Sequence, residues 1–333
     1  MKTLSAYLKA PWQVELRTIK LPDQPPPGWL LLRVEACGIC GTDLTEAVRR
    51  ADWAPFGHEI AGVVEAVGHG VEHLPPGTRV ALESASFCGR CELCRNGRVD
   101  LCNRAPNFWG QAAMGFSQFM LAPACCAVPY ESLEPDEACL AEPAGVAYDL
   151  VKVADIRLGD KVCVVGPGSL GLMAVVLAQR SGAQVVHCLG RTPGHRLRVA
   201  CDLGAVTVAS TAWDRVPMLH RFFDHVLLTA PVQFIPPALA LLAYEGRLTY
   251  IGIGPGDGTI SFDANDFHFR KLQLRASFAS PAVYFPRVLG LLRADILPAQ
   301  KFISHRFALA DIGAALALLR DRKDETVKVV ITP

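Results

Sequence analysis

Four closely spaced cysteines constrain the fold of this chain more than any other feature of its sequence. The pattern is C-x2-C-x2-C-x7-C, at Cys88, Cys91, Cys94 and Cys102. Four thiolates at this spacing, with Gly89 and Gly97 between them for tight turns, suit a closed tetrahedral zinc site. Because four protein ligands leave no position open for a substrate, we expect this zinc to be structural. It should organise a small lobe over about residues 84–104.

The use of cysteine also indicates a compartment. The chain has 12 cysteines in 333 residues, and in a reducing compartment these are thiols or metal ligands, not a disulfide framework. Lys9, Glu15 and Arg17 interrupt the apolar residues near the N-terminus, so the sequence shows no secretory signal. We therefore expect the protein to be cytoplasmic.

Charge and composition narrow the choice of partner. The net charge is +1, with 20% charged and 51% hydrophobic residues, which gives no basic surface for nucleic acid or an acidic membrane. This disfavours a zinc-ribbon nucleic-acid binder, which the quartet alone would allow. Two uncharged stretches, residues 109–130 and 226–244, contain Gln and Pro and are better explained as buried elements than as membrane spans. We expect a small-molecule partner.

A second group of metal-binding residue types lies upstream. Cys37 and Cys40 form C-x-x-C, and Gly57-His58-Glu59 follows. A redox pair would not explain the nearby His58, whereas Cys40 and His58 are ligands that zinc prefers. Glu59 is either a third ligand or a residue that orients the others. The residues alone leave open a catalytic metal and an ordinary pair of core or surface side chains.

A glycine-rich turn predicts a nucleotide site. The β-branched run at residues 161–165 leads into the sequence G-x-G-x-x-G, and an apolar, helix-capable segment and a second strand follow. This order is the dinucleotide-binding unit, in which backbone approaches the pyrophosphate at a helix N-terminus. The expected contacts are Gly166, Gly168, Ser169, Leu170 and Gly171. The alternative is a glycine-rich turn without a ligand.

The end of the second strand bears on the choice of cofactor. An NAD site usually has an acidic residue there, but this chain reads Leu189-Gly190-Arg191, with Arg196 downstream and no carboxylate before Asp202. Gly190 leaves room for a 2′-phosphate, and Arg191 and Arg196 can pair with it. We expect NADP to be favoured over NAD. The alternative is that these arginines only solvate a helix face.

Taken together, these motifs resemble those of the zinc-containing medium-chain alcohol dehydrogenases along nearly the whole chain. The resemblance is carried by Cys40-Gly41-Thr42-Asp43, Gly57-His58-Glu59, the cysteine quartet, the glycine turn and the closing Lys328-Val329-Val330-Ile331. It implies an enzyme that transfers a hydride between a secondary alcohol, polyol or sugar-like substrate and NADP(H) or NAD(H). A zinc-independent reductase or a non-catalytic binding protein of the same superfamily is the alternative.

The resemblance also implies residue roles. A catalytic zinc would be held by Cys40, His58 and Glu59, with Glu142 as a direct or water-bridged partner, so the chain would hold two zinc ions. Thr42 matches the hydroxyl that takes the substrate proton, and Asp43 the acid beside His58. Glu142 stands where the sorbitol, threonine and glucose dehydrogenase branches of the family carry glutamate.

This sequence departs from the family pattern at two further places. The connection from Cys40 to His58 is shorter than usual, and Thr45 stands where many relatives have the histidine that ends a proton relay. Phe108, Trp109 and Phe116 fall near the family's substrate pocket, although they read equally well as core aromatics.

The fold implied by the resemblance has two domains. A GroES-like (chaperonin-10-like) β domain would use residues 1–147 and 281–333, and a doubly wound Rossmann domain residues 148–280. The active site would lie in the cleft between them, and the family is commonly dimeric or tetrameric. The sequence pattern predicts strands at 30–36, 61–67, 79–82, 223–229, 246–252 and 326–332, and helices at 237–243 and 308–320.

Overall fold

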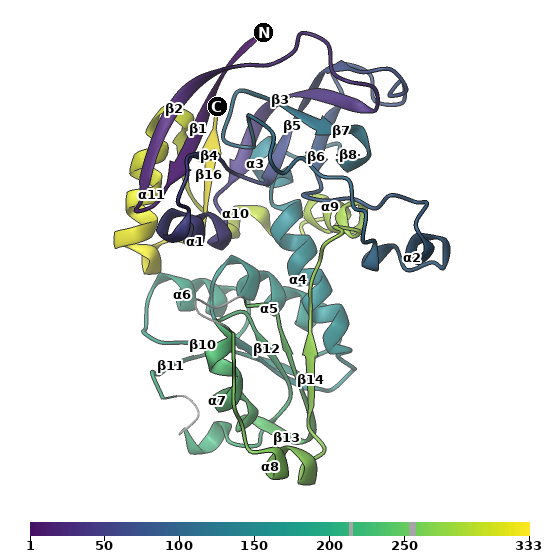
Figure 1. Cartoon of the computed structure of the whole chain (residues 1–333). Coiled ribbons are helices and arrows are strands. Elements are labelled where there is room, and N and C mark those ends of the chain that lie inside the picture. Colours follow the sequence, from purple (N-terminus) through teal and green to yellow (C-terminus); the bar gives the residue numbers. More distant parts are fainter. Residues whose placement is uncertain (213–215, 253–257) are drawn as a thin grey trace. The chain divides into compact units, whose positions relative to one another are not determined.

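The computed structural model describes residues 1–212, 216–252 and 258–333, and these form two compact units (Figure 1). Unit 1 combines Met1–Gly145 with Ala279–Pro333, and unit 2 is Val146–Phe278. The boundaries expected from the sequence lie within two residues of these. No helix in the described ranges combines the length and the apolar run that crossing a bilayer requires.

Unit 1 is built mainly from strands. Its strands are β1 (Lys2–Lys9), β2 (Gln13–Lys20), β3 (Trp29–Gly38), β4 (Ala54–Pro55), β5 (Glu59–Val67), β6 (Arg79–Leu82), β7 (Phe119–Pro123), β8 (Ala127–Pro129), β15 (Ile303–Ala308) and β16 (Lys328–Thr332). Its helices are α1 (Gly41–Arg49), α2 (Glu92–Arg95), α3 (Pro135–Ala138), α9 (Phe285–Arg293), α10 (Ala299–Phe302) and α11 (Ile312–Asp321).

Two sheets organise these elements. One has the order β2-β1-β4, and the other has the order β15-β16-β3-β5-β6-β8, with β7 also paired to β3. β3 lies at the centre of the larger sheet, paired with β16, β5 and β7, and seven of its ten residues are buried. Its last residue, Gly38, pairs with Glu59 of β5 and with Val330 of β16. The first and last thirds of unit 1 therefore meet at the end of β3.

The cysteine lobe has almost no apolar core of its own. Its buried cluster consists of Cys91, Cys94 and Cys102, with a few partly buried neighbours, and Leu101 at its surface is 48% exposed. A segment this small cannot bury enough apolar surface to hold its fold. The sulfur atoms occupy the place that a hydrophobic core takes elsewhere.

Unit 2 contains one parallel sheet. Its strands are β9 (Lys161–Val165), β10 (Val185–Gly190), β11 (Val206–Ala209), β12 (Phe223–Leu228), β13 (Leu242–Tyr250) and β14 (Gln273–Ala276). Its helices are α5 (Ser169–Arg180), α6 (His195–Asp202), α7 (Ile235–Leu239) and α8 (Ala264–Phe269), while α4 (Ala141–Ala154) begins in unit 1 and continues into unit 2. The strand order β11-β10-β9-β12-β13-β14 is that of the doubly wound dinucleotide-binding fold. This confirms the Rossmann prediction.

Most predicted elements form close to where the sequence placed them, and one does not. The helix expected at 237–243 is α7, which begins at Ile235 and ends at Leu239, and β13 already begins at Leu242. Two prolines lie in the first turn of α7, where a backbone N–H has no partner within the helix and its loss costs nothing. The helix has only five residues, which is too short to produce a helical period in the sequence. The sequence pattern therefore assigned part of β13 to a helix.

Candidate active site

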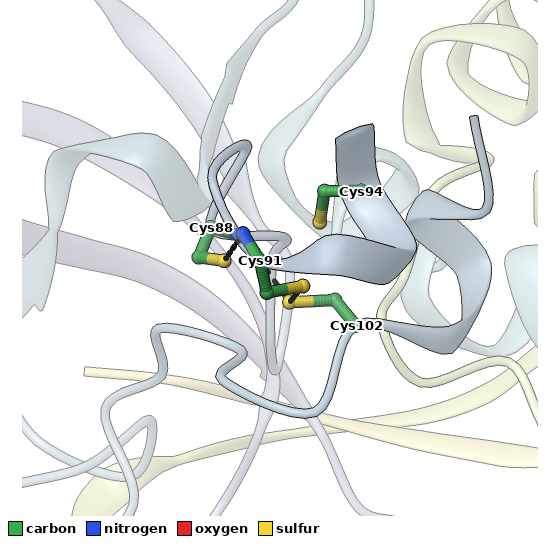
Figure 2. Close-up of side chains that lie close together, drawn as sticks. All are labelled: Cys88, Cys91, Cys94 and Cys102. Atoms are coloured by element: carbon green, nitrogen blue, oxygen red, sulfur yellow. Dashed lines mark hydrogen bonds between the residues drawn. The ribbon is translucent and has the colours of Figure 1, made fainter. Parts of the chain in front are cut away.

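The four cysteines of the lobe converge on one point (Figure 2). Their sulfur atoms all lie within 4.8 Å of one another, and Sγ of Cys91 is 3.9 Å from Sγ of Cys102. Thiolates about 2.3 Å from a tetrahedral zinc stand about 3.8 Å apart, so the spacing suits the ion. Within the described parts of the chain, this is the single group of potential ligands drawn together so tightly.

Backbone N–H groups point at these sulfur atoms. The N–H of Cys88 donates to Sγ of Cys102 at 3.4 Å, and the N–H of Cys91 donates to Sγ of Cys88 at 3.3 Å. Hydrogen bonds from the backbone of Arg90 and Cys91 lower the pKa of Cys88 to about 6. A thiolate is the form that binds zinc. The residues present therefore suit a structural zinc.

Cys40 of the second group stands at the start of a helix. It is the N-cap of α1, and the Asp43 carboxylate accepts a hydrogen bond from the Cys40 N–H at 2.8 Å. The Cys40 Sγ lies 3.7 Å from the Thr42 hydroxyl oxygen. One helical turn thus holds Cys40, Thr42 and Asp43 in a defined relation.

His58 is a buried imidazole surrounded by anionic groups. Burial lowers its pKa, but the charge of Cys40, a side-chain hydrogen bond to Cys40, and the charges of Asp43 and Glu142 together raise that pKa well above its usual value. The Nδ1 of His58 is buried without a hydrogen-bond partner and lies 3.8 Å from Oδ1 of Asp43. The same convergence of negative charge on a nitrogen donor favours a divalent cation.

Glu59 has a partner that the sequence did not reveal. Both carboxylate oxygens accept hydrogen bonds from the Lys328 ammonium, at 2.6 and 2.7 Å, and the third bond of Lys328 goes to the Ile39 carbonyl at 3.1 Å. The side chains of Lys328 and Glu59 are 3% and 1% exposed. A Cβ on Gly38 would lie 2.1 Å from Oε2 of Glu59, so only glycine leaves space for this carboxylate. Lys328 appeared in the sequence only as part of the closing strand.

Glu142, Thr42 and Thr45 are the remaining residues that the sequence associated with the catalytic site. Burial raises the pKa of Glu142 to about 7, and the nearby His58 opposes that shift. Thr42 is exposed and its hydroxyl can face a ligand, whereas the hydroxyl of Thr45 donates to the Gly41 carbonyl at 3.2 Å within α1. The Thr45 hydroxyl therefore donates its proton within its own helix turn and does not donate it to a proton relay.

The three aromatic residues considered from the sequence separate into two kinds. Phe108 and Phe116 are fully buried in the core of unit 1, and Phe116 packs on Phe56 with ring centroids 4.7 Å apart. Trp109 is 44% exposed, and its ring centroid lies 5.2 Å from that of His58. Only Trp109 borders the group of metal donors.

The glycine turn of unit 2 has the shape a pyrophosphate needs. Gly166 has a φ of +110°, and a Cβ on Gly171 would lie 1.9 Å from the Gly166 carbonyl oxygen. A Cβ on Gly168 would meet nothing within 4 Å, so space is open at this glycine. Gly168 is the N-cap of α5, and no side chain caps the helix. Its first N–H groups, at Ser169 and Leu170, remain available for an anion.

Thr229 supports this turn and was not found by sequence reasoning. It follows β12, and its hydroxyl donates to the Gly166 carbonyl at 2.8 Å. β9 and β12 are neighbours where the strand order reverses, which is where such folds bind ligands. The sequence alone does not identify Thr229 as part of the turn, because the Gly166 carbonyl that it contacts is 63 positions away.

Gly190, Arg191 and Arg196, which we expect to determine the cofactor preference, differ in their exposure to solvent. Gly190 ends β10 and is buried, and a Cβ there would lie 3.1 Å from Cγ of Pro167 and 3.2 Å from Leu197. Its small size therefore serves packing against Pro167 and Leu197. Arg191 is exposed directly after the strand, and Arg196 lies in the first turn of α6, partly buried.

Two family models match most of the chain. The alcohol dehydrogenase GroES-like domain matches residues 26–132, and the zinc-binding dehydrogenase domain matches residues 169–294. Among curated proteins, the chain is 31% identical to L-threonine 3-dehydrogenase of Pyrococcus abyssi, with 79% of this chain and 78% of the relative covered. It is 26% identical to L-galactonate-5-dehydrogenase of Escherichia coli, with 91% of each covered.

Solved structures agree with these matches. An alcohol dehydrogenase from Thermus sp. ATN1 has a TM-score of 0.88 at 27% identity, covering 99% of each chain. A protein from Sinorhizobium meliloti 1021, considered a zinc-binding dehydrogenase and bound to NADP, has a TM-score of 0.88 at 26% identity and covers 100% of each chain.

The role of the quartet can be tested by removing one sulfur. In Cys94→Ser the lobe loses a zinc ligand, so we expect one zinc fewer per chain by elemental analysis. Because loss of a metal is among the largest single-residue effects, the free energy of unfolding should fall by about 4 kcal/mol. Cys201→Ser, at an exposed cysteine outside the quartet, is the matched control. Unchanged zinc content in Cys94→Ser would contradict a structural zinc.

The buried pair can be tested by a double-mutant cycle. Lys328→Met leaves the Glu59 carboxylate buried without its counter-charge, which should cost about 3–5 kcal/mol of unfolding free energy in a denaturant titration. The double change Glu59→Gln with Lys328→Met removes both charges and should recover part of that loss. A Lys328→Met protein as stable as the wild type would show that the pair is not closed in solution.

Proposed function

We propose, from the premise that this chain belongs to the zinc-type alcohol dehydrogenase family, that it is a zinc-dependent oxidoreductase of secondary alcohols or polyols. It would transfer a hydride between such a substrate, or its ketone, and a nicotinamide cofactor. The observation that carries this proposal is the buried imidazole of His58 in unit 1. Its Nδ1 has no hydrogen-bond partner and lies 3.8 Å from Oδ1 of Asp43, and the charges of Cys40 and Glu142 also act on it. Unit 2 contributes the glycine turn for the nucleotide.

Cys40 and His58 would hold the catalytic zinc. When bound, the ion polarises the substrate oxygen and lowers the pKa of an alcohol. We assign Glu142 as the carboxylate that would help to hold this zinc, because both oxygens of Glu59 already accept hydrogen bonds from Lys328. Glu59 would then act chiefly as a positioning residue, and would become a ligand only by giving up that pair. With the cysteine quartet, the protein would carry two zinc ions per chain.

Thr42 would move the substrate proton. Its exposed hydroxyl lies beside the Cys40 sulfur and can accept a hydrogen bond from an alcohol while donating its own proton onward. Thr45 cannot extend this path, because its hydroxyl is bonded to the Gly41 carbonyl. We therefore propose that water completes the relay in this protein.

NADP is the cofactor that we favour over NAD. The cofactor would place its pyrophosphate at the N–H groups of Ser169 and Leu170, beside the open space at Gly168. No carboxylate stands at the end of β10, and the exposed Arg191 follows that strand. A guanidinium pairs with a 2′-phosphate, whereas an acid would repel it. Twelve reduced cysteines suit the cytoplasm, and we expect a homodimer or homotetramer by analogy with the family.

The catalytic zinc can be tested by removing its thiolate. Cys40→Ser should lower kcat/KM by at least about 100-fold, because changes that only misorient metal ligands already cost 10- to 100-fold. The measurement is nicotinamide absorbance on mixing enzyme, NADP⁺ and a panel of polyols and simple secondary alcohols, with zinc content and far-UV circular dichroism as checks of the fold. Activity retained by Cys40→Ser would contradict the proposal. One zinc per wild-type chain would favour a zinc-independent reductase.

The cofactor preference depends on one guanidinium. Arg191→Ala should raise KM for NADP⁺ by about tenfold, since a charge-assisted bond contributes about 1.5–3 kcal/mol. KM for NAD⁺ should change little, because NAD⁺ has no 2′-phosphate. Arg198→Ala, an exposed arginine of α6, is the matched control. Equal effects on both cofactors would remove the case for NADP.

A further inference from the structure

One face of α1 carries a stripe of polar side chains that leads away from the proposed metal donors. Thr42 and Glu46 are four residues apart on α1, so their side chains lie on the same side of the helix. Arg50, the C-cap residue four positions further on, extends this stripe because its side chain pairs with Glu46. Thr42 adjoins Cys40 at one end of this stripe. At the other end, Glu46 and Arg50 form a paired carboxylate and guanidinium.

The Glu46–Arg50 pair has well-defined geometry. Nη2 of Arg50 lies 2.7 Å from Oε1 of Glu46, and Nε of Arg50 donates to Oε2 at 3.1 Å, so both oxygens are engaged in a two-pronged contact. The backbone anchors it as well, because the Arg50 N–H donates to the Glu46 carbonyl and the Arg50 carbonyl accepts from Ala10. The side chains of Arg50 and Glu46 remain 31% and 26% exposed.

This stripe forms one wall of a cavity that lies wholly within unit 1. The cavity has a volume of about 80 Å³ and is lined by Thr42, Glu46 and Arg50 on the helix side. The opposite side is mostly apolar, with Phe56, Trp109 and Met114. Trp109 also contacts His58, at 5.2 Å between ring centroids. The cavity therefore extends from Thr42, beside Cys40, to the ion pair, and Trp109 in its wall borders His58.

We propose that the Glu46–Arg50 pair determines substrate class by binding a second hydroxyl group, so that the enzyme prefers straight-chain polyols over alcohols with a single hydroxyl. This inference rests on the proposed function. It adds that the distal hydroxyl, and not only the reacting one, is recognised. Neither Glu46 nor Arg50 touches the reacting atoms, so they are specificity residues.

The chemistry of the pair selects a hydroxyl over other groups. A hydroxyl can accept a hydrogen bond from the guanidinium and donate one to the carboxylate at the same time. A carboxylate or phosphate on the substrate would be repelled by Glu46, and an amine by Arg50. A hydrocarbon would displace water from both charged groups without replacing its hydrogen bonds. A site that bonds a hydroxyl discriminates strongly against an analogue that lacks it.

The length of the stripe sets the length of the substrate. Residues four apart in an α-helix are separated by about 6 Å along the axis. A hydroxyl on the carbon next to the reacting one does not span that distance from Thr42, whereas one several carbons away does. The proposal therefore points to extended pentitols and hexitols in place of small vicinal diols.

The test uses the zinc-loaded, full-length enzyme and three designed variants. Glu46→Leu with Arg50→Met makes the end of the cavity apolar at similar volume. Glu46→Arg with Arg50→Glu reverses the pair and keeps both a donor and an acceptor. Arg322→Met with Glu325→Leu removes an exposed ion pair of the same unit, distant from the cavity residues in the chain, and serves as the control.

The measured quantity is the ratio of kcat/KM for sorbitol to kcat/KM for hexan-2-ol. We expect the apolar variant to lower this ratio by at least about tenfold, mainly by raising KM for sorbitol. The reversed pair should keep most of the wild-type ratio, and the control all of it. A ratio that is unchanged in the apolar variant, or that falls as far in the control, overturns the proposal. Should the apolar variant not fold, Glu46→Gln is judged by the same ratio.

A binding measurement separates this proposal from the proposed function. If the wild-type enzyme turns over neither alcohol, the proposed function fails, and calorimetric titration of sorbitol and hexan-2-ol then decides the role of the pair. Preference for sorbitol in the wild type that is lost in the apolar variant supports it. Equal or absent binding of the two alcohols by the wild type overturns it.

Discussion

The contact on which unit 1 depends most is the buried pair of Lys328 and Glu59. It joins the last strand of the chain to β5 across 269 positions of sequence, and it satisfies all three donors of the ammonium through Glu59 and Ile39. Two charges are desolvated there, so the pair is tolerated only with complete hydrogen bonding. Gly38 is part of the same arrangement, since any side chain at that position would occupy the place of the carboxylate.

This pair lies next to the proposed metal donors, and the charges of Cys40 and Glu142 reach Lys328 as well. Unit 1 thus gathers several acidic groups around one imidazole and one ammonium. Such a cluster is costly without positive charge, which explains why the pKa of His58 and that of Lys328 are both raised. A divalent cation would satisfy the same excess of negative charge. The charge arrangement of unit 1 and the proposed chemistry therefore have a common electrostatic origin.

Unit 2 depends on close backbone approach instead of charge. Gly171 brings α5 against the Gly166 carbonyl, and Thr229 holds that carbonyl from the neighbouring strand. The result is a helix N-terminus with unsatisfied N–H groups beside open space at Gly168. The lobe of the cysteine quartet follows a third principle, because sulfur atoms and their N–H donors stand where an apolar core would otherwise be.

The sequence by itself determined the parts whose chemistry is local. The spacing of Cys88, Cys91, Cys94 and Cys102 predicted a group of sulfurs that the structure brings together, and the strand, glycine turn and helix around Gly166 predicted the Rossmann unit. Tertiary structure alone decided the partner of Glu59, the support of the turn by Thr229, and the packing at Gly190. Each of these joins residues tens to hundreds of positions apart, and no local periodicity or spacing records such a contact. The cavity at Glu46 and Arg50 is of the same kind, since a helix face acquires a binding role only when other segments close around it.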